Sequence, residues 1–146
     1  MPNEIRRLAF SYAETLSALR SYGERFQVKM PKGSLLHARF AAVDEEKEAT
    51  GHQDHKALFK AYNVRQNRSN LVLTFYNDKD DSHTPYILTA DFVTAALIQY
   101  CLGEDIMLPK SARKTLDITD FQLCLDMEMD IRTQGQETPL VFADED

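Results

Sequence analysis

The chain has 146 residues, of which 43% are hydrophobic and 27% charged, and its formal net charge is −6. This composition is typical of one globular domain and excludes a disordered chain. The longest apolar run, Ala95–Ile98, is far shorter than the ~20 residues of a membrane span, so we expect no membrane segment. The first residues contain no apolar signal core, and we therefore expect a cytoplasmic protein in which Cys101 and Cys124 are reduced.

The first predicted element is a helix over about residues 4–22. Apolar residues recur every three or four positions from Ile5 to Leu19, which is typical of an amphipathic helix. Asn3 is a suitable N-cap for this helix, and Gly23 is a suitable end.

A pair of strands is predicted to follow this helix. Residues 26–30 and 36–40 each alternate apolar and polar side chains, and a Pro-Lys-Gly turn separates them, so we expect a hairpin. Residues 44–55 are polar and predict a solvated loop. Residues 56–64 fit either a short helix or one face of a strand, and both alternatives remain open.

The next segments predict strands and a second helix. Residues 71–76 are rich in side chains that suit a pleated surface, and 85–88 predict a further short strand. A helix is expected over about 90–102, with Thr89 as its N-cap. Because this helix is apolar almost all round, we expect it to be buried on several sides.

The clearest pattern is the strict alternation of apolar and polar residues over 121–132. It predicts a long antiparallel strand with one face in the core, joined by a tight hairpin to a strand at 113–118. The predicted fold class is therefore α+β, with an antiparallel sheet of about five strands and two main helices packed on one face. We expect residues 1–132 to form a single domain and 133–146 an acidic C-terminal tail.

The polar face of the last strand is a candidate partner-binding surface. Alternate residues of a strand lie on one side, about 6.6–6.8 Å apart. Three carboxylates therefore form a ladder there: Asp126, Glu128 and Asp130. This ladder fits a docking surface for a basic partner, and it equally fits a solvated face that discourages edge-to-edge aggregation.

The tail supplies three further candidate partner-binding residues: Leu140, Val141 and Phe142. Burial of a large apolar side chain is worth roughly 1.5–3 kcal/mol, so we expect these residues to pack. They would form a short edge strand on their own domain, or they would bind a partner or a second copy of the chain by strand addition.

A basic segment gives the first alternative, a nucleic-acid-associated regulator. Lys56, Lys60, Arg65 and Arg68 would contact phosphates while nearby aromatic side chains stack on bases. The acidic chain as a whole argues against nucleic acid as a partner, and a basic face that balances acidic segments explains the same residues.

Neither a metal site nor a cofactor site is predicted. His52 and His55 have a short spacing but no third ligand, and the calcium-like run 78–81 lacks the glycine and glutamate of an EF-hand loop. Neither Cys101 nor Cys124 has an electropositive setting that would activate a thiol. No cofactor is expected, and an enzyme whose site is assembled from separated residues remains the second alternative.

The leading hypothesis is a cytoplasmic, non-enzymatic protein–protein interaction module that acts as an adaptor, a regulator or a chaperone-like factor. In small size, acidity and element order the chain is similar to the small acidic chaperones of bacterial secretion systems, although it shares no motif with them and the final helix of that group is missing. The leading hypothesis expects another protein as the partner, and it allows a homodimer.

Overall fold

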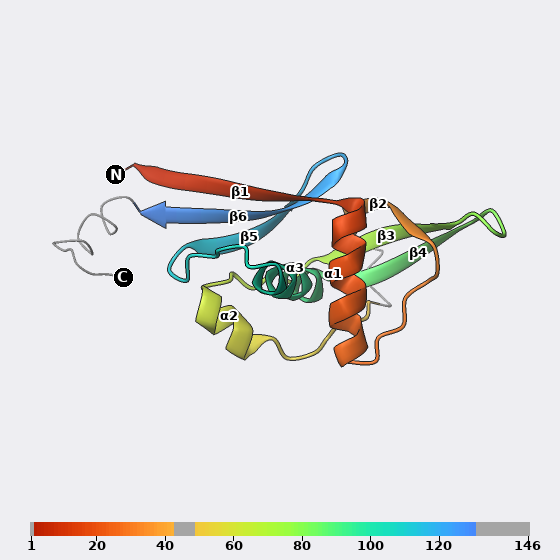
Figure 1. The fold of residues 1–146 in the computed structure, drawn as a ribbon, viewed down its shortest axis with the longest axis horizontal. Helices are drawn as coiled ribbons and strands as arrows, with labels where there is room; N and C mark the ends of the chain where they lie inside the picture. Colours follow the sequence, from red (N-terminus) through yellow and green to blue (C-terminus); the bar gives the residue numbers. More distant parts are fainter. Residues whose placement is uncertain (1, 43–48, 131–146) are drawn as a thin grey trace.

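The computed structural model describes residues 2–42 and 49–130 (Figure 1). In these ranges the fold is α+β, with two three-stranded antiparallel sheets and three helices. The elements are, in chain order, β1 (Asn3–Ser11), α1 (Tyr12–Arg25), β2 (Ser34–Phe40), α2 (Lys56–Tyr62), β3 (Asn70–Asn77), β4 (Ser82–Thr89), α3 (Ala90–Gly103), β5 (Arg113–Ile118) and β6 (Gln122–Asp130). The predicted class is confirmed, but the single sheet of about five strands with two helices is not what forms.

The first sheet, in the order β1-β6-β5, joins the two ends of the described chain. β1 pairs with β6 along its whole length, from Asn3 opposite Asp130 to Ser11 opposite Gln122. The predicted hairpin of β5 and β6 is confirmed. The predicted inward orientation of Leu125 on β6 is also confirmed, because this side chain is fully buried.

The predicted helix over 4–22 is wrong in its first half, because residues 3–11 form β1. The reason is visible at Ser11, the N-cap of α1. Its hydroxyl accepts from the backbone N–H of Glu14 at 3.1 Å, and the Glu14 carboxylate accepts from the Ser11 N–H at 2.9 Å. This capping box fixes the helix start, and α1 then continues through Gly23, the predicted end, to Arg25.

The predicted strand over 26–30 is also wrong. Gln27 adopts a positive φ of 58°, and the backbone N–H groups of Phe26 and Val28 both donate to the Gly23 carbonyl. These residues therefore close the last turn of α1 instead of pairing with β2.

β2 pairs with β3, in the second sheet of order β2-β3-β4. The register shifts between Leu35 and His37, which is the signature of a bulge. As a result Leu35 is buried, whereas Leu36 and Phe40 are 49% and 37% exposed. The bulge thus breaks the alternation that the sequence predicted for this strand.

α3 forms the centre of the core. It contacts β4 of one sheet and β5 of the other, and α1 packs across it (Figure 1). Its predicted cap is confirmed, since the Thr89 hydroxyl accepts from the Phe92 N–H at 3.2 Å. Nine of its residues are buried, as expected for a helix that is apolar almost all round.

Both cysteines are buried and unpaired. Burial raises the pKa of the Cys101 thiol to about 11, so this thiol stays protonated at neutral pH. None of the helices in the described ranges is long and apolar enough to cross a membrane.

Lys114 of β5 is a lysine with no exposed surface. Its ammonium group donates to the carbonyl oxygens of Tyr62, Pro109 and Ala112, at 2.5, 2.6 and 2.8 Å. Burial lowers the pKa of Lys114 to about 8, which leaves the amine protonated at neutral pH. Lys114 therefore ties the end of α2 to the turn before β5.

Candidate functional site

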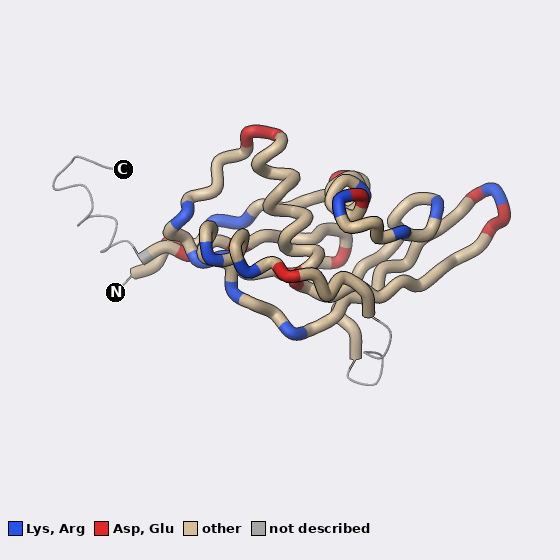
Figure 2. Tube along the Cα trace, turned by 90° about the horizontal axis from the view of Figure 1, so that it is seen from below, with Lys and Arg blue, Asp and Glu red and all other residues tan. Residues whose placement is uncertain are grey.

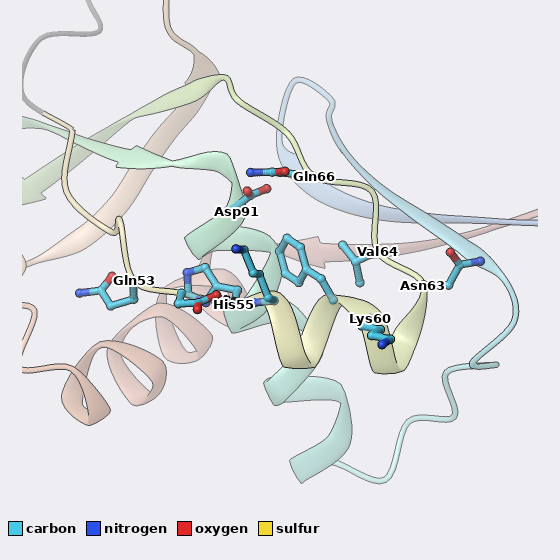
Figure 3. A pocket seen from close by; sticks show the side chains of 10 residues that line it. Gln53, His55, Lys60, Asn63, Val64, Gln66 and Asp91 are labelled. Carbon is cyan, nitrogen blue, oxygen red and sulfur yellow. Dashed lines mark hydrogen bonds between the residues drawn. The ribbon is translucent and has the colours of Figure 1, made fainter.

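An open pocket of about 730 Å³ lies beside α2 (Figure 3). We call it the α2 pocket. Its wall comes from the residues before α2, from α2 itself, from the segment after it and from the first turn of α3. The lining residues are Gln53, Asp54, His55, Lys56, Phe59, Lys60, Asn63, Val64, Gln66 and Asp91.

The N-terminus of α3 holds the two segments that flank α2. The Thr89 hydroxyl donates to the Gly51 carbonyl at 2.7 Å, and the Asp91 carboxylate accepts from the Asn67 N–H at 2.8 Å. Gly51 has a φ of +91°, and an added Cβ would lie 2.8 Å from the Phe92 side chain, so a glycine is required there. The helix that forms the core thus also positions the pocket.

His55 is the buried polar centre of the α2 pocket, with only 7% of its surface exposed. Its Nδ1 lies 2.8 Å from the Tyr22 hydroxyl, and its ring stacks on Phe59 with 5.8 Å between centroids. His55 Nε2 and Gln53 Oε1 are buried, and neither has a hydrogen-bond partner among the described residues. A buried polar atom without a partner costs about 1–3 kcal/mol, which is why such atoms are uncommon in folded proteins.

The two ionisable groups at the base of the pocket are shifted in opposite directions. Burial lowers the pKa of His55 below its ordinary value, and the negative charge of Asp91 opposes that shift. Burial raises the pKa of Asp91, which the Asn67 N–H and His55 oppose. His55 is therefore a neutral imidazole at neutral pH, able to accept or donate a hydrogen bond.

The His55 shift predicts a loss of stability in mild acid. In the unfolded chain His55 takes up a proton near its ordinary pKa of 6.5, whereas folded His55 does so only at lower pH. Below pH 6.5 the unfolded state therefore binds more protons, and the free energy of unfolding falls as the pH falls. Urea unfolding at neutral and mildly acidic pH should show a steeper loss for the native chain than for His55→Phe. Equal losses in the two proteins would contradict a buried neutral His55.

The described lining of the pocket contains no serine, threonine or cysteine. The predicted solvated loop over 44–55 is wrong at His55, because the cluster of aromatic rings around it buries the imidazole. His52 is exposed, and its Nε2 lies 3.1 Å from the Ala49 carbonyl. No group of three or more metal-ligating side chains occurs within the described ranges.

The acidic ladder lies on the outer face of the first sheet, where its described members pair with neighbouring strands. Asp126 binds Arg7 of β1 at 2.7 Å, and Glu128 binds Arg113 of β5 at 2.9 Å. Arg7 also binds Asp117 at 2.7 Å, and the two carboxylates raise the pKa of its guanidinium. These pairs neutralise part of the charge that a basic partner would meet.

The remaining predicted partner residues lie at or beyond the end of the described chain. Asp130 ends β6 opposite Asn3, and its side chain is outside the described part. Leu140, Val141 and Phe142 are also outside the described residues.

The four cations of the basic segment border two neighbouring hollows. Lys56 and Lys60 line the α2 pocket, whereas Arg65 and Arg68 line a hollow of about 350 Å³ beside β5. Gln66 lines both hollows. Several Lys and Arg segments lie toward the end of the molecule where the N-terminus is drawn (Figure 2).

Sequence reasoning missed the α2 pocket, although two signals were present. His55 precedes Phe59 by four residues, the spacing that brings side chains together on a helix. Asp91 lies in the first turn of the predicted helix over 90–102, where an acid is favourable, and it also holds the segment after α2. Comparison of the chain with protein-family models, curated proteins and solved structures finds no match.

Proposed function

We propose that this protein is a non-catalytic protein–protein interaction module, an adaptor, regulator or chaperone-like factor, that receives a segment of its partner in the α2 pocket. One observation carries the proposal: two buried polar atoms of the pocket, Gln53 Oε1 and His55 Nε2, have no partner within the described chain. The volume of about 730 Å³ falls in the range of ligand pockets in proteins.

A peptide segment is the occupant that suits the mixture of groups in the α2 pocket. Gln53 and Asp91 offer acceptors for N–H donors, and Lys56 and Lys60 offer donors for carbonyl or carboxylate oxygens. Phe59 and Val64 add apolar surface between these polar groups. A peptide carries donors, acceptors and apolar side chains together, whereas a ligand of one charge sign would use only half of these groups.

The test is a screen of short N-acetylated, C-amidated peptides against the isotope-labelled protein by amide NMR. Binders should shift the signals of Asp91 and of residues within 53–66, because the lining residues of the pocket lie there. Gln53→Leu should weaken the best binder by about tenfold, the effect of one lost hydrogen bond to a buried acceptor.

Gln122→Leu is the matched control, since Gln122 is exposed on β6 and does not line the pocket. Binders whose shifts map to another surface would contradict the proposal. An equal effect of the two glutamine substitutions would contradict it as well.

The arrangement of the basic segment favours a second candidate function, that of a nucleic-acid-associated regulator. Lys56 and Lys60 border one hollow and Arg65 and Arg68 the next, so a single strand following both would meet four cations. We expect no measurable binding of single-stranded oligonucleotides near physiological salt. Micromolar binding that falls steeply with added salt, and is lost when the four cations are neutralised, would favour this candidate instead.

A cytoplasmic location is part of the proposal. Its support is the pair of buried, unpaired thiols, Cys101 and Cys124, which suit a reducing compartment.

A further inference from the structure

Within residues 2–42 and 49–130, β1 presents a long edge with no strand paired to it. It is the outer strand of its sheet, and β6 occupies its other side along the whole length. Residues 3–7 of β1 are all exposed, with Ile5 at 69%, and this end of the strand extends past the helices (Figure 1). An exposed strand edge is a ready template for pairing with another strand.

We propose that two copies of this chain pair through their β1 strands, antiparallel and about a two-fold axis at Ile5. The β1-β6-β5 sheet of one copy and the β1-β6-β5 sheet of the other would then form one continuous six-stranded sheet. This inference goes beyond the proposed function and uses none of the residues of the α2 pocket.

The pleat of the strand limits the possible registers. Facing residues in a sheet must lie on the same face, so a two-fold pairing of β1 with itself has to place one residue opposite its own copy. Near the exposed end the candidates for this central position are Glu4, Ile5, Arg6 and Arg7.

Charge selects among these registers. Centres at Glu4, Arg6 or Arg7 would each place two like charges directly opposite one another, which is destabilising. A centre at Ile5 places Glu4 of each copy opposite Arg6 of the other, so two opposite-charge pairs form. It also brings the two exposed Ile5 side chains together, which removes apolar surface from water.

The shape of the molecule permits this register. α1 begins at Tyr12, and the two copies overlap only near residues 3–7, so the bodies extend in opposite directions from the axis.

A charge exchange tests the register. Glu4→Lys alone and Arg6→Glu alone each turn attractive pairs into repulsive ones, and each should weaken the dimer by about tenfold or more in sedimentation equilibrium. The double variant Glu4→Lys/Arg6→Glu restores opposite charges and should recover the association of the native chain. Glu24→Lys is the matched control for Glu4→Lys. Glu24 is exposed on α1, so this substitution changes the net charge by the same amount but away from the β1 edge.

A cross-link gives an independent readout. Facing residues have Cβ atoms about 4.5–5.5 Å apart, so Ile5→Cys should give a symmetric disulfide-linked dimer when treated with oxidised glutathione. Phe121→Cys is the control, since Phe121 is more exposed, at 77%, and lies at the β5–β6 hairpin. A native chain that stays monomeric at the highest attainable concentration would overturn the proposal. A double variant that associates no better than the single variants, or equal cross-linking of the two cysteine variants, would also overturn it.

Discussion

Leu125→Asp is expected to unfold the protein. Leu125 has no exposed surface and lies on the inner face of β6, the central strand of its sheet, opposite Leu8 and Leu116. The substitution would bury a carboxylate without a partner, at a cost of several kcal/mol. That cost is comparable with the whole stability of a typical domain, about 5–15 kcal/mol. Circular dichroism should show a chain that is largely unfolded or melts far below the native protein.

Glu128→Gln is the matched control three residues later on the same strand. The Glu128 side chain is 35% exposed, and its contact with Arg113 is a surface ion pair. Removing its charge should change the free energy of unfolding by less than about 1 kcal/mol. Similar losses for Leu125→Asp and Glu128→Gln would mean that the two faces of β6 have been assigned wrongly.

Lys114→Met is expected to have the second largest effect. Methionine fills a similar volume, but it leaves the carbonyl oxygens of Tyr62, Pro109 and Ala112 buried without their shared donor. Each such oxygen costs about 1–3 kcal/mol, and relaxation or water entry recovers part, so we expect a total loss of about 3–5 kcal/mol.

Denaturant unfolding of Lys114→Met should be compared with that of Lys110→Met. Lys110 is exposed in the same connection before β5, and its ammonium lies 5.7 Å from the Tyr62 ring. Its loss should cost less than about 1 kcal/mol. If the two variants are equally stable, Lys114 does not tie α2 to β5 as its contacts indicate.

The N-terminal strand shows where sequence patterns mislead. Ile5, Leu8 and Tyr12 have helical spacing, yet the first two lie in β1 because β6, more than a hundred residues later, supplies their hydrogen-bond partners. A local clue was present, since Ser11 and Glu14 have the spacing of a capping box and mark the true helix start. Pairing with a distant strand outweighed the helical periodicity of a mostly exposed segment.

Elements with strong local signals were predicted well. β6 alternates strictly, and α3 combines the Thr89 cap with an apolar surface all round, so both were found nearly at their true bounds. The division into two sheets was not predictable, since it depends on β1 joining β6, a strand more than a hundred residues later. That pairing leaves no periodic trace in the sequence.

The α2 pocket could not be assembled from the sequence because its wall comes from distant segments. The hydrogen bonds from Thr89 to Gly51 and from Asn67 to Asp91 hold the segments on either side of α2 at the N-terminus of α3. The acidic ladder, in contrast, was placed correctly on the outer face at Asp126 and Glu128. Its pairing with cations of both neighbouring strands was missed, since register between strands is a tertiary property.

Pairing of the first strand with the last also has a consequence for biosynthesis. Arg7 and Asp126 are 119 residues apart. At a translation rate of about 5–20 residues per second, β1 is synthesised roughly 6–24 s before its neighbour β6. The three strands of the β2-β3-β4 sheet lie closer together in the sequence, so all of them are synthesised well before β6. A nascent chain stalled before β6 would therefore contain every strand of the second sheet but would lack the partner of β1, and this unpaired β1 is what a ribosome-associated chaperone would meet.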